Sequence, residues 1–217
     1  TLTSTTTRAK FYAPGSYVLR LTADDGQYSG FDEVNVTVDL DNAITNGLQA
    51  YWKFSEPNGV AAVADSSGNN RHATLSGATL SPGRFNNAID LDGVDDYASF
   101  ASPDLNQISV VGWIRMDGSG DSPSPRVINM PGYNVRVKRD SVSGHSLAFE
   151  AERSSTPAEW RTDLGTLTDA TWYHFAVAYD PYVPGFVPQM YLNGAAQNVT
   201  EIGTGTGSLV SNVGTGY

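Results

Sequence analysis

The chain has 217 residues, enough to bury a full core, and it carries a formal net charge of -10 with 22 glycines, 11 prolines and no cysteine. The negative charge disfavours nucleic acid and anionic membranes as partners, and the absence of cysteine excludes disulfide bonds. No stretch has the length of a transmembrane helix, so we expect no membrane insertion. Frequent Thr, Ser, Asn, Val and Tyr favour strands and turns over helices.

Near the N-terminus, residues 16–23 and 32–38 alternate between apolar and polar side chains, which predicts two strands. Asp24, Asp25 and Gly26 lie between them and predict the turn of a hairpin. Two strands cannot close a sandwich by themselves, so we expect residues 1–39 to be only part of a domain. The polar residues 40–46 are expected to form a linker.

From residue 47 to residue 217, short apolar stretches alternate with clusters of Gly, Pro, Asn and Asp. Asn193 and Gly194 are a turn signal, because both tolerate the positive φ that a tight hairpin needs. Many short strands separated by turns favour a sandwich or a jelly roll over an α/β fold. The predicted strands include residues 48–54, 108–116, 135–138, 146–150 and 172–179.

The N-terminal motifs resemble those of a known family. PGSYVLRLTADDG at residues 14–26, followed by EVNVTV at residues 33–38, is similar to the C-terminal half of a PKD-type immunoglobulin-like domain. The resemblance implies a partial immunoglobulin-like β-sandwich at the start of the chain.

Six further motifs together resemble the laminin-G-like (concanavalin-A-like) jelly roll of bacterial surface proteins and polysaccharide-degrading enzymes. The resemblance implies an all-β chain with a jelly-roll sandwich over residues 47–217. The family's closing strand, of the type Ile-Asp-Glu-Val-Arg-Ile-Tyr, has no counterpart before the last residue, so we expect the C-terminal strand to be missing. The motifs are GLQAYWKF at 47–54, DSSGNNRHA at 65–73, NAIDLDGVDDY at 87–97, ISVVGWI at 108–114, TWYHFAVAYD at 171–180 and MYLNG at 190–194.

A loop dense in oxygen donors begins at residue 65. Gly68 would let its backbone fold back, and calcium binds six to eight oxygens. Tight turns use the same residue types without any ion, but in the family this loop often holds a structural calcium. The three histidines are widely spaced and have no cysteine partners, which disfavours zinc. We predict a structural calcium with ligands from Asp65, Asn69, His72, Asp95 and Asp96.

Catalysis is not expected. Asp90-x-Asp92-x-x-Asp95 would place two carboxylates on one strand face, as a retaining glycosidase requires. The spacing is similar to the Glu-x-Asp-x-x-Glu signature of laminarinase-type enzymes, but it has Asp at both ends and leads into a turn. We therefore expect this chain not to be an enzyme.

Sugar binding needs exposed aromatic rings and polar groups close together. Trp160 is the first candidate because its neighbours are polar. By contrast, Trp52, Trp113 and Trp172 lie among Val, Ile and Phe and are predicted to pack in the core. The candidate ligand-binding residues are Trp160, Arg161, Tyr133, Arg136 and Tyr182.

These features favour a non-catalytic binding or adhesion module outside the cell or on its surface, with a glycan or a neighbouring surface protein chain as partner. One alternative is an architectural subunit or spacer of a surface protein or filament, whose uncovered strand edges would allow self-association. A third is an ancillary domain of a polysaccharide-degrading enzyme. The first residues, TLTSTTTRAK, carry no signal-peptide pattern, so export would depend on a signal outside this chain.

Overall fold

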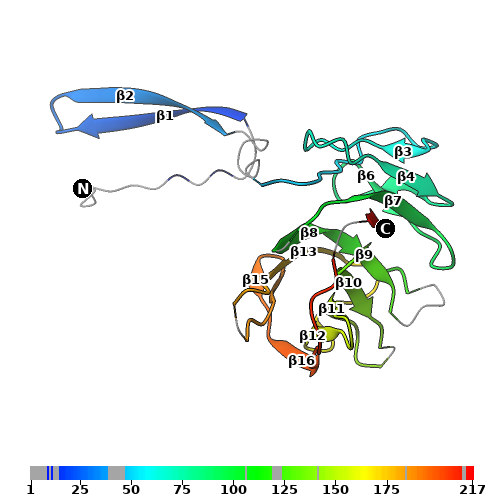
Figure 1. Ribbon diagram of the computed structural model, residues 1–217. Helices are drawn as coiled ribbons and strands as arrows, with labels where there is room; N and C mark the ends of the chain where they lie inside the picture. The colour runs from blue at the N-terminus through cyan, green and yellow to red at the C-terminus, as the bar shows by residue number, and fades with distance from the viewer. Residues whose placement is uncertain are drawn as a thin grey trace. The chain divides into compact units, whose positions relative to one another are not determined.

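The computed structural model describes residues 9, 11, 15–38, 47–105, 107–118, 124–140, 142–183, 185–211 and 214–217. The chain divides into two compact units, residues 1–48 and 49–217, and each is considered by itself. The described residues form strands, turns and irregular segments and contain no helix (Figure 1). The predicted all-β class is therefore confirmed.

The first unit contains one antiparallel hairpin of β1 (Gly15–Asp24) and β2 (Ser29–Val38). Its turn is stabilised by Asp25, whose Oδ1 accepts the N–H groups of Gln27 at 2.9 Å and Tyr28 at 2.8 Å. Gly26 has a φ of 89°, which side chains other than glycine rarely adopt. The predicted hairpin is confirmed, with strands slightly longer than expected.

Large apolar side chains of this hairpin remain exposed. Val18 is 60% exposed, Leu21 70%, Phe31 64% and Val34 56%. A two-stranded ribbon that buries so little apolar surface is at best marginally stable in water, so further strands are needed for an independent domain. The immunoglobulin-like sandwich stays a prediction, and the predicted linker lies outside the described residues.

The second unit is built around two antiparallel sheets, with strand orders β16-β12-β11-β10-β9 and β15-β14-β13-β8 (Figure 1). The core lies between them. Their strands are β8 Ile108–Arg115, β9 Arg126–Met130, β10 Tyr133–Lys138, β11 Ser146–Ala151, β12 Ala158–Thr162, β13 Trp172–Tyr179, β14 Gln189–Leu192, β15 Ala195–Ala196 and β16 Val199–Gly203.

A further sheet, of order β17-β7-β4-β3, adjoins the five-stranded sheet. Tyr217 and Asn129 of β9 exchange two backbone hydrogen bonds of 2.7 Å, which connect the two sheets at this point. The remaining strands are β3 Ala62–Val63, β4 Ala73–Ser76, β7 Tyr97–Ser102, β17 Gly214–Gly216 and the separate hairpin β5 Thr79–Pro82 with β6 Asn87–Asp90.

Aromatic rings fill the centre of the core. The Phe149 and Tyr179 rings lie 5.1 Å apart between centroids, Trp160 and Tyr179 5.4 Å, and Tyr133 and Phe149 5.9 Å. These four rings come from three strands of one sheet and one strand of the other, so they join the two layers. The arrangement confirms the predicted jelly-roll sandwich.

Four of the five predicted strands and the predicted turn are present. Asn193 has a φ of 50° and Gly194 of 80°, and together they close the two-residue turn between β14 and β15. The expected strand over residues 48–54 is wrong, because only Trp52 forms an isolated bridge there, to Asp65. Trp52 still packs against the core, with its ring edge-on to Phe100 at 4.7 Å.

The prediction that Trp113 and Trp172 fill the core is wrong. Alternation along β8 buries Ile108 and directs Trp113, which is 38% exposed, away from the core. Trp172 lies directly opposite Arg115 on the same outer face. The reason is the strand period of two, which sends Trp113 to the same side as the polar residues of β8.

Candidate functional site

Strand alternation separates the predicted ligand-binding residues. Tyr133 and Trp160 are only 1% and 5% exposed and point into the core, so neither offers an exposed ring to a ligand. Arg136 and Arg161 lie on the same two strands but on the opposite face of the sheet. The structure therefore corrects the aromatic part of the prediction and brings the two arginines together.

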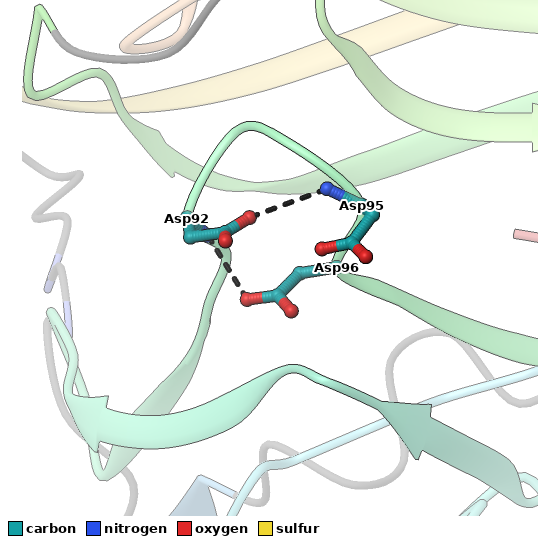
Figure 2. A group of neighbouring side chains, drawn as sticks. All are labelled: Asp92, Asp95 and Asp96. Carbon is teal, nitrogen blue, oxygen red and sulfur yellow. Dashed lines mark hydrogen bonds between the residues drawn. The ribbon is translucent and has the colours of Figure 1, made fainter.

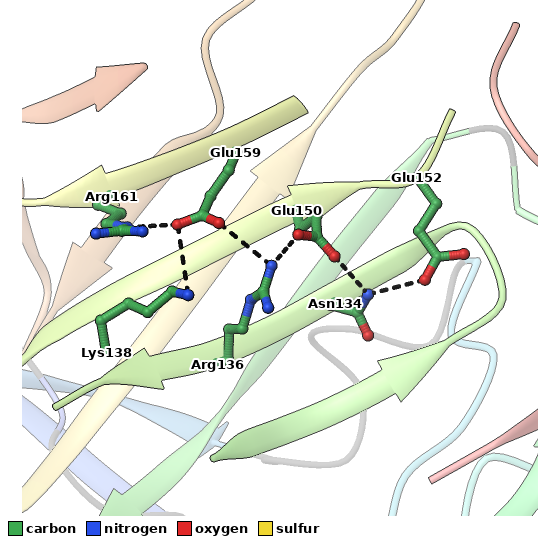
Figure 3. A network of polar contacts seen from close by, with 7 residues as sticks. All are labelled: Asn134, Arg136, Lys138, Glu150, Glu152, Glu159 and Arg161. Carbon is green, nitrogen blue, oxygen red and sulfur yellow. Dashed lines mark hydrogen bonds and ion pairs between the residues drawn. The ribbon is translucent and has the colours of Figure 1, made fainter. Parts of the chain in front are cut away.

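On the face of β10, β11 and β12 opposite to the core, polar side chains of these strands and Glu152, which directly follows β11, form a network that we call the polar sheet face (Figure 3). Directly opposite positions on the strands, such as Glu150 and Glu159, place these groups side by side. The polar sheet face consists of Asn134, Arg136, Lys138, Glu150, Glu152, Glu159 and Arg161.

Arg136 holds the centre of this face. Its Nη2 donates to Glu150 Oε2 and lies 3.3 Å from Glu159 Oε2, so one guanidinium joins two carboxylates. Arg161 Nε donates to Glu159 Oε1, and Lys138 Nζ lies 3.8 Å from the same oxygen. Glu159 is thus contacted by three cations (Figure 3).

Asn134 extends the network along the sheet. Its Nδ2 donates to Glu150 Oε1 and to Glu152 Oε1, each at 3.1 Å. Asn134 Oδ1 and Arg136 Nε are buried and have no hydrogen-bond partner among the described residues. The network therefore retains an unused acceptor and an unused donor.

The central charges are largely shielded from water. The side chains of Arg136, Glu150 and Glu159 are 12%, 13% and 14% exposed, whereas that of Arg161 is 32% exposed. Burial raises the pKa of Glu159, but the hydrogen bond and charge of Arg161, with Lys138 and Arg136, outweigh it and lower that pKa. Burial and the charge of Arg136 lower the pKa of Lys138.

The two central glutamates of this face are ion-paired. A glycosidase needs one protonated carboxylic acid beside a carboxylate. Arg136 contacts both Glu150 and Glu159, and although burial raises the pKa of Glu159, the charges of Arg161, Lys138 and Arg136 together lower it. The exposed edges of the face can instead donate from Arg161 and Lys138 and accept at the glutamates.

The fifth predicted residue, Tyr182, lies in a loop and is 65% exposed. Its N–H donates to Asp180 Oδ1 at 2.9 Å. The same loop covers a pocket of about 280 Å³ lined on the other side by Trp160, Tyr179 and Arg153. Tyr182 does not line this pocket, so the structure does not join it to the polar sheet face or to the pocket.

Asp65 organises its own loop. Oδ1 accepts the N–H groups of Tyr51 and Ser67 at 2.8 Å, and Oδ2 accepts the Arg71 N–H at 2.9 Å and the Ser67 hydroxyl at 2.7 Å. Burial raises its pKa, but the hydrogen bonds from Ser67, Arg71 and Tyr51 outweigh it and lower the pKa to about 2. Four protein donors thus occupy the carboxylate, which does not fit the role of a calcium ligand.

The other predicted ligands near Asp65 also have structural partners. His72 Nδ1 accepts the Asp65 N–H at 3.0 Å, and Asn69 Nδ2 donates to Gln49 O at 3.2 Å. The first bond closes the loop on itself, and the second ties it to the segment before β3. Hydrogen bonds between protein groups thus connect the side chains of this loop.

Asp95 and Asp96 lie in a different loop, together with Asp92 (Figure 2). Carboxylate oxygens of these three residues, which we call the acidic loop, lie within 4.8 Å of one another. Asp92 Oδ1 accepts the Val94 N–H at 2.8 Å, and Asp96 Oδ2 accepts the Asp92 N–H at 3.0 Å. The predicted ligand set is therefore divided, since Asp65 is not part of this group.

The acidic loop also corrects the geometry expected for Asp90, Asp92 and Asp95. β6 ends at Asp90, and the next residues form a turn rather than a strand. The three carboxylates therefore do not share one strand face. Asp96 instead packs closely against Gly77, where an added Cβ atom would clash with its Oδ1.

The two packed antiparallel sheets define a β-sandwich of the jelly-roll kind. Residues 92–215 match the family described as the concanavalin A-like lectin/glucanases superfamily. The match covers more than half of the chain, which therefore belongs to this superfamily. No curated protein and no solved structure matches the chain significantly. Among the described residues, no helix is long and apolar enough to span a membrane.

Most of the polar sheet face is absent from the sequence prediction. Glu150 and Glu159 give no motif, and their pairing depends on the register of β11 and β12. The sequence Glu159-Trp160-Arg161 does contain a signal for this face. In a strand the two charged residues share one side, so the aromatic ring between them points to the other, buried side.

Proposed function

We propose that this protein is a non-catalytic glycan-binding module of a surface or secreted protein. The observation that carries the proposal is the polar sheet face, where Arg136 joins Glu150 and Glu159 on rigid strands. Membership of a superfamily named for lectins and glucanases supports a carbohydrate ligand. The high negative charge and low lysine content suit an extracellular location.

The polar sheet face suits sugar hydroxyls, which donate and accept hydrogen bonds. Its planar side chains are held in place by ion pairs, so little ordering is needed when a ligand binds. Its three cations, Arg136, Lys138 and Arg161, balance the three glutamates of the face, so a neutral ligand meets no net charge. Partly buried ion pairs contribute little net stability to a fold. A contribution to stability therefore does not explain why the protein has this network.

The proposal is tested with isothermal titration of neutral glycans: β-glucan, galactan, xylan and soluble chitin oligosaccharides. Arg161→Gln should weaken binding of the recognised glycan roughly tenfold, because a charge-assisted hydrogen bond at the accessible edge is lost. The melting temperature should change little, since the Arg161 side chain is 32% exposed.

Arg20→Gln is the matched control, because it removes an arginine from an Arg–Glu ion pair in the other unit. It should leave binding unchanged, and no glycan should release reducing ends. Binding that survives Arg161→Gln contradicts the assigned face. Failure to bind any glycan, with concentration-dependent assembly, supports the architectural alternative, which the exposed apolar side chains of the hairpin favour.

We also propose a structural calcium ion, now at the acidic loop instead of Asp65. Asp92, Asp95 and Asp96 offer carboxylate oxygens close together on the surface, which fits part of a calcium shell. The repulsion between three neighbouring carboxylates would be relieved by a bound cation. The ion would fix this loop and take no part in glycan chemistry.

Chelation is therefore expected to lower the melting temperature. At a calcium concentration one hundred times the dissociation constant, binding stabilises the fold by about 2.7 kcal/mol, or about 5–11 °C for a chain of this size. Asp95→Asn should abolish the difference between calcium and EDTA in a thermal melt, whereas Asp104→Asn, at another exposed position, should preserve it. Identical wild-type melting curves in calcium and EDTA would contradict this site.

A further inference from the structure

The outer face of the sheet formed by β8, β13 and β14 carries rows of aromatic and basic side chains. Cross-strand pairing places Trp113 opposite His174 and Arg115 opposite Trp172. Directly opposite residues of antiparallel strands project to the same side. Phe175 of β13 is buried in the core. Since side chains alternate between the two faces of a strand, Trp172 and His174 point to the outer face.

A loop between β5 and β6 adds two more side chains to this face. The Phe85 ring lies edge-on to Trp113 with centroids 5.6 Å apart, and Trp113 lies edge-on to His174 at 5.4 Å. The Arg84 guanidinium carbon lies 5.3 Å from the Phe85 centroid and 5.4 Å from that of Trp113. We call Arg84, Phe85, Trp113, Arg115, Trp172 and His174 the aromatic–arginine surface.

Packing does not account for this surface. Phe85 is 63% exposed, Trp113 38% and the adjacent Val111 59%, and none of them belongs to the core cluster. Each leaves apolar surface in contact with water, and burying that surface against a ligand would contribute about 25 cal/mol of favourable free energy per Å². A contiguous exposed apolar patch on a folded domain marks an interaction site more often than scattered apolar residues do.

The two arginines supply the charge of this patch. Both are exposed, and Arg115 lies 5.8 Å from the Trp172 ring centroid. Among the described residues, neither Arg84 nor Arg115 has a carboxylate within ion-pair distance. In a chain with a net charge of -10, two unpaired guanidiniums beside aromatic rings make a local positive site.

We propose that the aromatic–arginine surface binds an acidic saccharide, whose sugar rings carry carboxylate or sulfate groups. The aromatic rings would pack against the C–H faces of the sugar rings, as aromatic walls do in binding sites generally. The guanidiniums of Arg84 and Arg115 would form charge-assisted, bidentate hydrogen bonds with the anionic groups.

This site is separate from the polar sheet face, because the two lie on the outer sides of different sheets with the core between them. The net charge of -10 repels polyanions from the rest of the protein surface. Binding of an acidic polysaccharide would therefore depend on this local positive site and not on the net charge. The inference goes beyond the proposed function, since it adds a second surface with a different ligand class.

Titration with polygalacturonate, dextran sulfate and uncharged dextran tests the proposal and distinguishes carboxylate from sulfate. The wild-type protein should bind at least one of the two polyanions and not dextran. The double variant Arg84→Gln/Arg115→Gln should weaken that binding at least tenfold, and Phe85→Ala should weaken it several-fold. Because Phe85 is exposed, Phe85→Ala should fold normally, which a thermal melt verifies.

The control is Arg20→Gln/Arg126→Gln, which removes the same two charges at exposed positions outside this surface. It should bind the polyanion like the wild type, and Arg84→Gln/Arg115→Gln should bind neutral glycans like the wild type. Lack of binding to both polyanions would overturn the proposal. Equal loss in both double variants, or equal binding of dextran, would overturn it as well, since net charge or a neutral sugar would then explain the result.

Discussion

Trp160→Ala is expected to lower the free energy of unfolding of the second unit by about 3–5 kcal/mol, as large-to-small changes at buried aromatic positions do. Trp160 is 5% exposed and contacts the rings of Phe149 and Tyr179, so its removal leaves a cavity between the two sheets. All four tryptophans lie in this unit, so fluorescence during urea unfolding, with circular dichroism as a second probe, measures its stability.

Trp113→Ala is the matched control, because it makes the same chemical change on the outer face of the other sheet. Trp113 is 38% exposed and lies outside the core cluster, so its loss should cost about 1 kcal/mol or less. Equal destabilisation by the two substitutions would contradict the assignment of Trp160 to the core and Trp113 to the surface.

Asp65→Ala is expected to destabilise the same unit by about 2–4 kcal/mol at pH 7, in calcium and in EDTA alike. The substitution leaves the partly buried N–H groups of Tyr51, Ser67 and Arg71 without their acceptor, and each such donor costs up to about 1–3 kcal/mol when water cannot replace the acceptor. A dependence of this loss on calcium would instead support the ligand role that the sequence predicted for Asp65.

The effect of Asp65 on stability should depend on pH. Its pKa in the folded protein is about 2, below the unfolded value of about 3.9, so its ionised form stabilises the fold by about 2 kcal/mol above pH 4. This contribution is lost as the pH falls from about 4 to about 2. The difference in unfolding free energy between wild type and Asp65→Asn should therefore shrink over that interval, and a constant difference would contradict the assigned pKa.

Much of the fold was predictable because the local patterns agree with the final structure. The alternation in residues 16–23 and 32–38 predicts the hairpin, and β8, β10, β11 and β13 lie where apolar runs predict strands. Asn193-Gly194 predicts the β14–β15 turn because both residues accept positive φ. These features depend on residues close together in the chain.

The candidate sites were predictable only in part. Arg136 and Arg161, which were expected to bind a ligand, lie together on the polar sheet face, whereas Trp160 and Tyr133 were expected to be accessible and instead point into the core. The alternation of side chains along β12 predicts the burial of Trp160, since Glu159 and Arg161 on either side of it point to the opposite face. Composition around Trp160 misled, because its polar neighbours in sequence lie on the other side of the sheet.

By itself, the sequence determined the all-β class, the turns and most strands, since each follows from side-chain period and backbone preference within a few residues. Tertiary structure decided which polar groups meet. Glu150 faces Glu159 through strand register, and both reach Arg136 on a third strand. It also separated Asp65 from the acidic loop and placed Phe85 on Trp113. Such contacts join residues distant in the chain, and their geometry exists only once the sheets have paired and packed.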